Sequence, residues 1–318
     1  MFVKDLSLTQ YGINDFVRPE NQKWITPNES DRFYRGGTRS LEIWEHLRQQ
    51  RCAKYPKWKE RITPQAIEIA AAIQDKGYYK IENFWDTNLL DAIKEQTLKM
   101  MSDAPAGKVK YPQDGRHTQV VHPLENIVLA NEMIVNKKIQ SIASAFLGSP
   151  PGLGTTNLRL STAEKLRGAP SGTNLFHKDF NSPVKFIKFF TYFNDVSIDN
   201  GPFTYVESSN RELPSTPHWS SQHRWPDDTI EQIYGKERII NNTANYGDLL
   251  IATTNGFHKG LKLKTGNRLM LTLNYVIHPE LGGSGFSGPP QKMHTVSKET
   301  YEQVEPEEQY LYDFMEKV

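Results

Sequence analysis

The chain has 318 residues and a single cysteine, Cys52, so no disulfide bond can form within it. Such scarcity is typical of proteins from a reducing compartment, and we expect a cytoplasmic protein. Lysine and arginine (38 residues) nearly balance aspartate and glutamate (37 residues), which gives a formal net charge of +1. A charge this small creates no overall field that would attract nucleic acid or an anionic membrane, and neither is expected as a partner.

Long hydrophobic runs are missing as well. No stretch approaches the 18 apolar residues of a transmembrane helix, and the opening residues, MFVKDLSLTQYGIND, lack the apolar core of a secretory signal. Aromatic residues are plentiful, with 15 Phe, 14 Tyr and 6 Trp, and they suit a sandwich lined by rings. A chain of this length can bury about three quarters of its unfolded surface, which is enough for one large core.

The first half of the chain has the pattern of helices that follow an irregular extension over residues 1–62, within which 41–55 could form one helix. A threonine cap, a proline at the first helical position and a closing glycine predict a helix over 63–77. Amphipathic spacing predicts further helices over 87–101 and 131–148. The segment between them, 102–123, reads as a loop.

From residue 155 onward the apolar period changes to two, which is the period of strands. Short strands divided by Gly, Pro and Asn turns predict an α+β but mainly β protein, with a double-stranded β-helix core of the jelly-roll or cupin-like kind. We expect one catalytic domain over 63–278, with helices over 63–150 packed on a jelly roll over 155–278. A Gly/Pro-rich loop and an acidic carboxy-terminal helix fill 279–318.

Four residues carry the strongest chemical signal. His177 and Asp179 stand in FHKDF, His258 in NGFHKG, and Arg268 in TGNRLMLTLNY, ten residues after the second histidine. Two imidazoles and one carboxylate make a facial metal triad with open positions, which suits non-haem Fe(II) and oxygen chemistry. The spacing lets the chain return on a neighbouring strand with a guanidinium that can hold an organic acid in a two-point fork.

These motifs resemble the phytanoyl-CoA dioxygenase family over roughly residues 64–278. The resemblance rests on HKD, on the turn IDNGPFTYVESSNR, and on GDLLIATTNGFHKG followed by GNRLMLTLNY. It implies an Fe(II)- and 2-oxoglutarate-dependent dioxygenase that releases succinate and CO2 as it uses O2 to hydroxylate a substrate. Ascorbate would serve as the reductant in vitro. Asp179 is intact, whereas related halogenases have a small residue there, so hydroxylation or another oxidation is favoured over halogenation.

The resemblance also suggests roles for individual residues. His177, Asp179 and His258 would hold the iron, and Arg268 would pair with the far carboxylate of 2-oxoglutarate. Thr272, on the same strand as Arg268, could add a hydrogen bond. Asn157 and Thr191 are weaker candidates for the keto-acid pocket, because polar residues on strands are often simply exposed.

The substrate is left open between a small molecule and a carrier-linked or CoA-linked acyl group. The segment 103–123 is the candidate recognition loop, through Arg116 and His117. A basic-aromatic stretch over 48–61 is a second candidate, although a solvated face is the simpler interpretation. The acidic tail could cap the barrel or form a homodimer contact.

Two alternatives to this enzyme remain. A non-catalytic jelly-roll protein could retain the metal, and a cupin-type enzyme could work without 2-oxoglutarate. The position of Arg268 argues against the second alternative.

Overall fold

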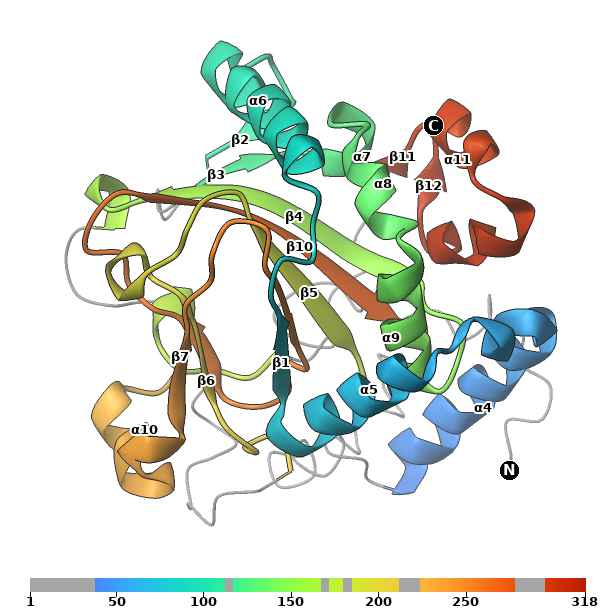
Figure 1. Ribbon diagram of the computed structural model, residues 1–318, viewed down its shortest axis with the longest axis horizontal. Helices are drawn as coiled ribbons and strands as arrows, with labels where there is room; N and C mark the ends of the chain where they lie inside the picture. The colour runs from blue at the N-terminus through green and yellow to red at the C-terminus, as the bar shows by residue number, and fades with distance from the viewer. Residues whose placement is uncertain (1–37, 112–116, 167–171, 180–184, 212–223, 278–294) are drawn as a thin grey trace, which may run out of the picture.

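The computed structural model of the protein describes residues 38–111, 117–166, 172–179, 185–211, 224–277 and 295–318. Figure 1 shows two layers of strands, with helices and the carboxy-terminal tail packed along the outer side of the larger layer. In this part of the chain, no helix has both the length and the apolar character needed to cross a bilayer.

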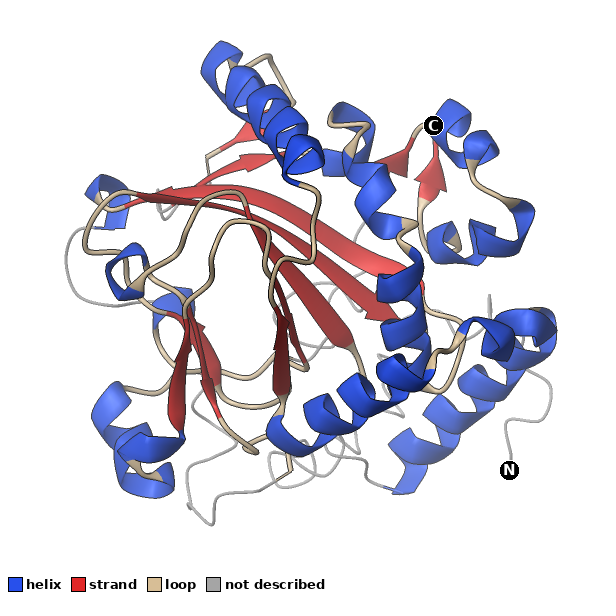
Figure 2. Ribbon diagram, in the orientation of Figure 1, coloured by secondary structure: helices blue, strands red, loops and turns tan. Residues whose placement is uncertain are grey.

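The larger layer is a seven-stranded sheet in which every neighbouring pair is antiparallel (Figure 2). Its strands, in spatial order, are β1 (Tyr78–Ile81), β8 (Leu249–Ala252), β5 (Ile187–Tyr192), β10 (Asn267–Val276), β4 (Gly152–Thr162), β3 (His117–Val120) and β2 (Val109–Lys110). The long strands β4 and β10 form its centre, paired from Gly152 and Val276 at one end to Thr162 and Asn267 at the other.

A three-stranded sheet faces the inner side of this layer. Its order is β7 (Ile239–Asn242), β6 (Phe203–Val206) and β9 (His258–Gly260). Aromatic rings join the two sheets: the Phe190 and Phe203 ring centroids lie 4.9 Å apart. Two sheets packed through rings form the expected jelly roll.

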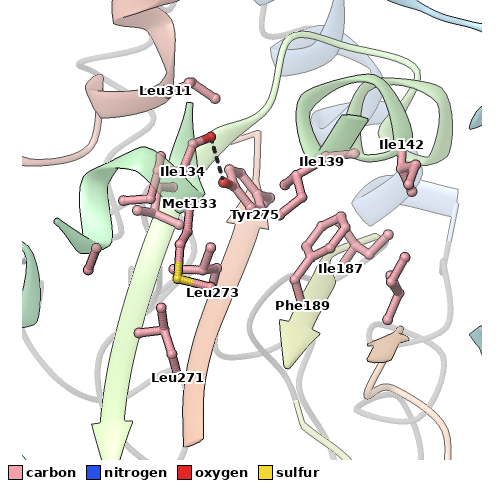
Figure 3. Packing of buried hydrophobic residues seen from close by; sticks show 14 of the residues in the cluster. Met133, Ile134, Ile139, Ile142, Ile187, Phe189, Leu271, Leu273, Tyr275 and Leu311 are labelled. Atoms are coloured by element: carbon pink, nitrogen blue, oxygen red, sulfur yellow. Dashed lines mark hydrogen bonds between the residues drawn. The ribbon is translucent and has the colours of Figure 1, made fainter. Parts of the chain in front are cut away.

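The outer side of the large sheet is apolar and holds the main core. Leu271, Leu273 and Tyr275 alternate along β10 on this face and are almost completely buried. Figure 3 shows them packed with Ile139 and other helical residues, and the Tyr275 hydroxyl donates to the carbonyl of Ile134 at 3.2 Å. Burying side chains of this kind stabilises a fold by about 1.5–3 kcal/mol each, so this face fixes the sheet in place.

Eight α-helices occur in the described part of the chain, and those near the amino terminus cover the outer face (Figure 1). They are α4 (Thr38–Lys54), α5 (Pro64–Lys76), α6 (Thr87–Asp103), α7 (Pro123–Asn126), α8 (Ala130–Ile134), α9 (Lys137–Leu147), α10 (Asp227–Tyr234) and α11 (Lys298–Gln303).

The helix α5 begins and ends as the sequence predicts. The Thr63 hydroxyl accepts from the amide of Ala66, and Gly77 closes the helix at φ +94°. A side chain at Gly77 would also collide with the ring of Tyr205. Glycine is therefore required both for the backbone conformation and for the space at this position.

Two predictions about local structure are wrong. The helix expected over 131–148 is broken in two, because the Asn136 side chain accepts from the amides of Lys138 and Ile139 and starts a new helix. The segment 102–123, expected as a loop, contributes the edge strands β2 and β3 to the large sheet. Val120 of β3 is completely buried in the main core, and this burial together with the pairing to β4 overrides the loop-like composition of the segment.

The amino-terminal helices and the carboxy-terminal tail are held together by buried charge. Arg51 is completely buried and donates to Asp313 at 3.0 Å, while Arg61 pairs with Glu308 at 2.8 Å. The Tyr55 hydroxyl donates to Asp313 as well. Two cations of the basic stretch over 48–61 therefore hold the tail, instead of lying on a solvated face.

Candidate metal centre

His177 and His258 are brought together by the backbone. They form an isolated antiparallel bridge in which the amide of His177 donates to the carbonyl of His258 at 2.9 Å, and the reverse bond is 3.0 Å. The two ring centroids consequently lie 4.3 Å apart. The amide of Asp179 donates to the carbonyl of Thr254 at 2.8 Å, which anchors the third residue beside them.

One ligand atom from each of these three residues can be chosen so that all lie within 4.8 Å of one another. The Nε2 atom of His258 is 3.3 Å from an Asp179 carboxylate oxygen, and that of His177 is 3.7 Å from the other. Adjacent ligands of an octahedral ion with bonds of about 2.1 Å lie about 3 Å apart, so a small contraction would close this set around a metal. The predicted triad is assembled.

Both imidazoles have the Nε2 atom directed to this cluster. The Nδ1 atom of His177 lies 2.9 Å from the carbonyl of Leu175, and that of His258 lies 3.0 Å from the carbonyl of Gly256. A carbonyl oxygen can only accept, so each Nδ1 carries the hydrogen and each Nε2 offers a lone pair. Metal-binding histidines are commonly oriented in this way.

The charge states also suit a metal. Burial, followed by repulsion from His258, lowers the pKa of His177 to about 3, so its ring is neutral at physiological pH. Burial opposes ionisation of Asp179, but attraction to the Lys188 ammonium outweighs it and holds the pKa of that carboxyl well below its usual range. A neutral ring at His177 and an ionised carboxylate at Asp179 are the forms that bind metal.

Lys188 on β5 is a member of the site that the sequence analysis did not identify. Its ammonium donates to an Asp179 carboxylate oxygen at 2.6 Å, and its side chain is 13% exposed. The available signal was a lysine inside the otherwise apolar run FIKFF, but only the fold shows that it points inward.

Arg268 approaches the triad from β10. It is 9% exposed, and its guanidinium lies over Gly260, where an added Cβ would be 3.4 Å from Nη2. Gly260 is two residues after His258 on β9, and residues two apart share one face of a strand. The guanidinium and the His258 ring therefore lie on the same side of β9, as the sequence predicts.

No carboxylate in the described residues pairs with Arg268, which donates to the backbone carbonyl of Gly201. Burial lowers the pKa of Arg268 despite the nearby Tyr192 hydroxyl. A guanidinium nevertheless stays charged in proteins, so this buried cation is suited to an anionic ligand.

Other polar side chains share this inner face. In the register of the large sheet, Thr272 pairs with Asn157, and His117 pairs with Ser161, which pairs in turn with Arg268. The Asn157 amide oxygen accepts from Gln119 at 3.0 Å and from Arg159 at 2.9 Å. The inner face of the large sheet thus holds three of the predicted site residues, Thr272, Asn157 and His117. Arg116 lies outside the described residues.

The structure corrects the placement of Thr191. This residue pairs with Leu249 and Leu271, so it points to the helix-covered outer face, and its hydroxyl accepts from the Trp85 indole at 2.9 Å. Neighbouring residues of a strand point to opposite faces, and Thr191 is one position out of phase with Lys188 and Phe190. It cannot belong to a keto-acid pocket on the inner face.

Solved structures with this fold were found. The chain is 15% identical to the epimerase SnoN in complex with Fe3+, alpha ketoglutarate and nogalamycin RO, with 73% of this chain and 95% of that chain covered and a TM-score of 0.53. It is 16% identical to EctD from S. alaskensis with 2-oxoglutarate and 5-hydroxyectoine, with coverages of 81% and 88% and a TM-score of 0.53. The chain is 15% identical to EctD from S. alaskensis with bound Fe. That comparison covers 74% of this chain and 87% of that chain, with a TM-score of 0.52.

No protein-family model matches the chain, and no curated protein matches it. At these identities the likeness establishes the fold. The chain therefore has the helix-covered jelly roll of these structures, with a His-Asp-His triad assembled inside it.

Proposed function

We propose that this protein is an Fe(II)- and 2-oxoglutarate-dependent oxygenase that hydroxylates a small-molecule or carrier-linked substrate. The observation that carries the proposal is the pairing of two sites on one inner face. The triad of His177, Asp179 and His258 offers three ligand atoms, and the buried guanidinium of Arg268 lies on the same side of β9 as His258.

The donor set fits iron. Two imidazoles and a carboxylate on one side leave the opposite positions open, as in the facial triads of non-haem iron enzymes. When bound, iron and 2-oxoglutarate supply the oxidative decarboxylation that yields succinate and CO2 and delivers the second oxygen atom of O2 to the substrate. The similar structures described with Fe and 2-oxoglutarate support this assignment.

The protein's own residues orient these groups and keep water away. Arg268 would hold the far carboxylate of 2-oxoglutarate in a two-point fork, and Thr272 lies on the same strand and face to assist. Asn157 lies opposite Thr272 and would contribute through its hydrogen-bonded network with Gln119 and Arg159.

Rings form the dry wall of the site. Phe203 stacks on the His258 ring, with centroids 5.5 Å apart, and Tyr205 and Phe190 extend this wall between the two sheets. Excluding water strengthens the electrostatic interactions inside and protects a reactive centre. His117 on β3 is proposed as a substrate contact, because it shares the inner face with Arg268.

The test is conversion of 2-oxoglutarate to succinate by purified protein with Fe(II), ascorbate and O2. We expect slow conversion without substrate, and its loss in His177→Ala, Asp179→Ala and His258→Ala, each with lower iron affinity. Full activity of Asp179→Ala at normal iron content would refute the assignment. Iron binding through the triad with no binding or conversion of 2-oxoglutarate would instead identify a non-catalytic metal-binding jelly roll.

A further inference from the structure

Tyr192 ends the strand β5 on the inner face of the large sheet. It pairs directly with Met270 of β10, and Arg268 lies two residues from Met270 on that strand. Directly opposed residues project to the same face, and so do residues two apart on one strand. The tyrosine and the arginine therefore lie on the same side of the sheet, and Tyr192 is 1% exposed there.

The two side chains end at neighbouring points of the small sheet. The guanidinium of Arg268 lies over Gly260 and donates to the carbonyl of Gly201. The Tyr192 hydroxyl accepts from the amide of Phe203 at 3.1 Å. Phe203 is two residues after Gly201 and is the direct partner of Gly260 in the antiparallel pair of β6 and β9. The Cα atoms of such partners lie about 4.5–5.5 Å apart, so the phenol and the guanidinium reach the same small region.

The electrostatics agree with this placement. Burial raises the pKa of Tyr192, and the positive charge of Arg268 opposes that rise. The tyrosine in turn raises the pKa of Arg268, against the larger effect of burial. The phenol therefore keeps its hydrogen at physiological pH and lies beside a fixed positive charge.

The hydrogen of the Tyr192 hydroxyl has no acceptor in the part of the chain that the structure describes. A phenol has one hydrogen to donate and lone pairs with which to accept. The bond from the Phe203 amide occupies a lone pair, and it is the one hydrogen bond of this hydroxyl among the described residues. A buried donor without an acceptor is unfavourable, so a bound molecule that supplies an acceptor here is stabilised.

This region is close to the metal centre. Phe203 stacks on the ring of His258, with centroids 5.5 Å apart, and Gly260 is two residues after His258 on β9. A short molecule that reaches from the triad to the guanidinium of Arg268 thus ends beside the Tyr192 hydroxyl.

We propose that the Tyr192 hydroxyl donates a third hydrogen bond to the far carboxylate of 2-oxoglutarate, beside the two-point fork from Arg268. This inference rests on the proposed oxygenase function. An ionised carboxylate has about four acceptor sites, so it can take the fork and the phenol together. The phenol donates to a carboxylate oxygen but not to a methyl group, so Tyr192 helps to select a keto acid with a second carboxylate.

The experiment measures binding to full-length protein loaded with Co(II) in place of iron, which blocks turnover. Calorimetry gives the Kd of 2-oxoglutarate and, by competition, that of 2-oxopentanoate, which has the same five carbons but ends in a methyl group. Tyr192→Phe should raise the Kd of 2-oxoglutarate by about tenfold or more, because a hydrogen bond to a charged group is lost. The Kd of 2-oxopentanoate should change little, so the preference for the dicarboxylate falls by the same factor.

The matched control is Tyr275→Phe. It removes another buried hydroxyl, one that donates to the carbonyl of Ile134 on the outer face of the large sheet. Both Kd values should stay at those of the wild type in this variant. A second probe, 3-fluorotyrosine at position 192, keeps the shape of the ring and makes the hydroxyl a stronger donor and a weaker acceptor. It should bind 2-oxoglutarate more tightly than the wild type does, even if Tyr192→Phe does not fold.

Three results would overturn the proposal. They are an unchanged Kd of 2-oxoglutarate in Tyr192→Phe, an equal rise of the Kd for both keto acids in that variant, and no gain in 2-oxoglutarate affinity with 3-fluorotyrosine. The second result would mean that Tyr192 supports the site only by holding the Phe203 amide. Failure of the wild-type protein to bind 2-oxoglutarate at all would instead refute the proposed function.

Discussion

The ammonium of Lys188 lies 2.6 Å from a carboxylate oxygen of Asp179, so the acidic residue of the triad is held by a side chain from a strand of the large sheet. The contact fixes the direction in which the remaining lone pairs of the carboxylate point. Such partners of metal ligands typically contribute 10- to 100-fold to affinity or activity.

We expect Lys188→Met to lower kcat, measured at saturating iron and 2-oxoglutarate, by about 10- to 100-fold. The physical reason is that the freed carboxylate can rotate and no longer presents one oxygen to the metal in a fixed direction. Lys188→Arg should restore part of the rate. An unchanged kcat in Lys188→Met would show that the backbone alone orients Asp179.

Arg268→Ala should raise the 2-oxoglutarate concentration needed for half-maximal turnover by about 10- to 100-fold, because it removes a charged two-point interaction. The iron requirement should change far less, since Arg268 is not a metal ligand. Arg268→Lys should recover only part of the loss, because a point charge does not reproduce the fork. Equal losses for iron and 2-oxoglutarate would indicate a collapsed site instead.

Gly260→Ala tests the close approach of the guanidinium. The added methyl would lie 3.4 Å from Nη2 and 3.7 Å from Nη1 of Arg268. This is tight enough to displace the charge by a few tenths of an ångström, and overpacking of this kind typically costs about 1 kcal/mol or more. We expect a several-fold rise in the KM for 2-oxoglutarate with kcat little changed, and a larger rise in Gly260→Val. The same KM in both variants would place the anion elsewhere.

The metal-free protein should lose stability as pH falls from about 6.5. The pKa of His177 is lowered to about 3 in the folded state, so the unfolded chain binds a proton first and is favoured by acid. When the pH is lowered from 7 to 5, protonation of His177 in the unfolded chain should by itself reduce the free energy of unfolding by about 2 kcal/mol. Asp179 acts below this window, because its stabilising contribution is lost only as pH falls through its depressed pKa.

Urea unfolding of the metal-free wild type and of His177→Gln at both pH values measures the contribution of His177 to the pH dependence of stability. The variant should show a smaller loss of stability from pH 7 to pH 5. Equal losses in the two proteins would mean that His177 is readily protonated in the folded state.

The triad and Arg268 could be predicted because their signals are local. His177 and Asp179 are two residues apart, and Arg268 follows His258 at a fixed spacing on a strand that pairs across the sheet. The place of Lys188 beside Asp179 could not be predicted, since it depends on which face of β5 turns toward the triad. The edge strand that contains His117 could not be predicted either, because it is defined by its pairing with the distant strand β4.

Thr191 was misassigned for a related reason. The strand β5 reads IKFFTY and is buried on both faces, so its sequence shows no alternation from which the phase could be derived. Only the pairing of Thr191 with Leu249 and Leu271 shows that it faces the helices. The break before α9 could have been predicted more easily, because Asn136 is a good helix cap.

The buried pair of Arg51 and Asp313 has a consequence for how the molecule is made. The two residues are separated by 262 positions, and Arg51 also donates to the carbonyl of Tyr310. During synthesis the helix α4 emerges early, but the Arg51 guanidinium meets Asp313 only once that residue has left the ribosome. Contacts between distant segments slow folding, so we expect α4 to dock late, together with the segment that contains Asp313.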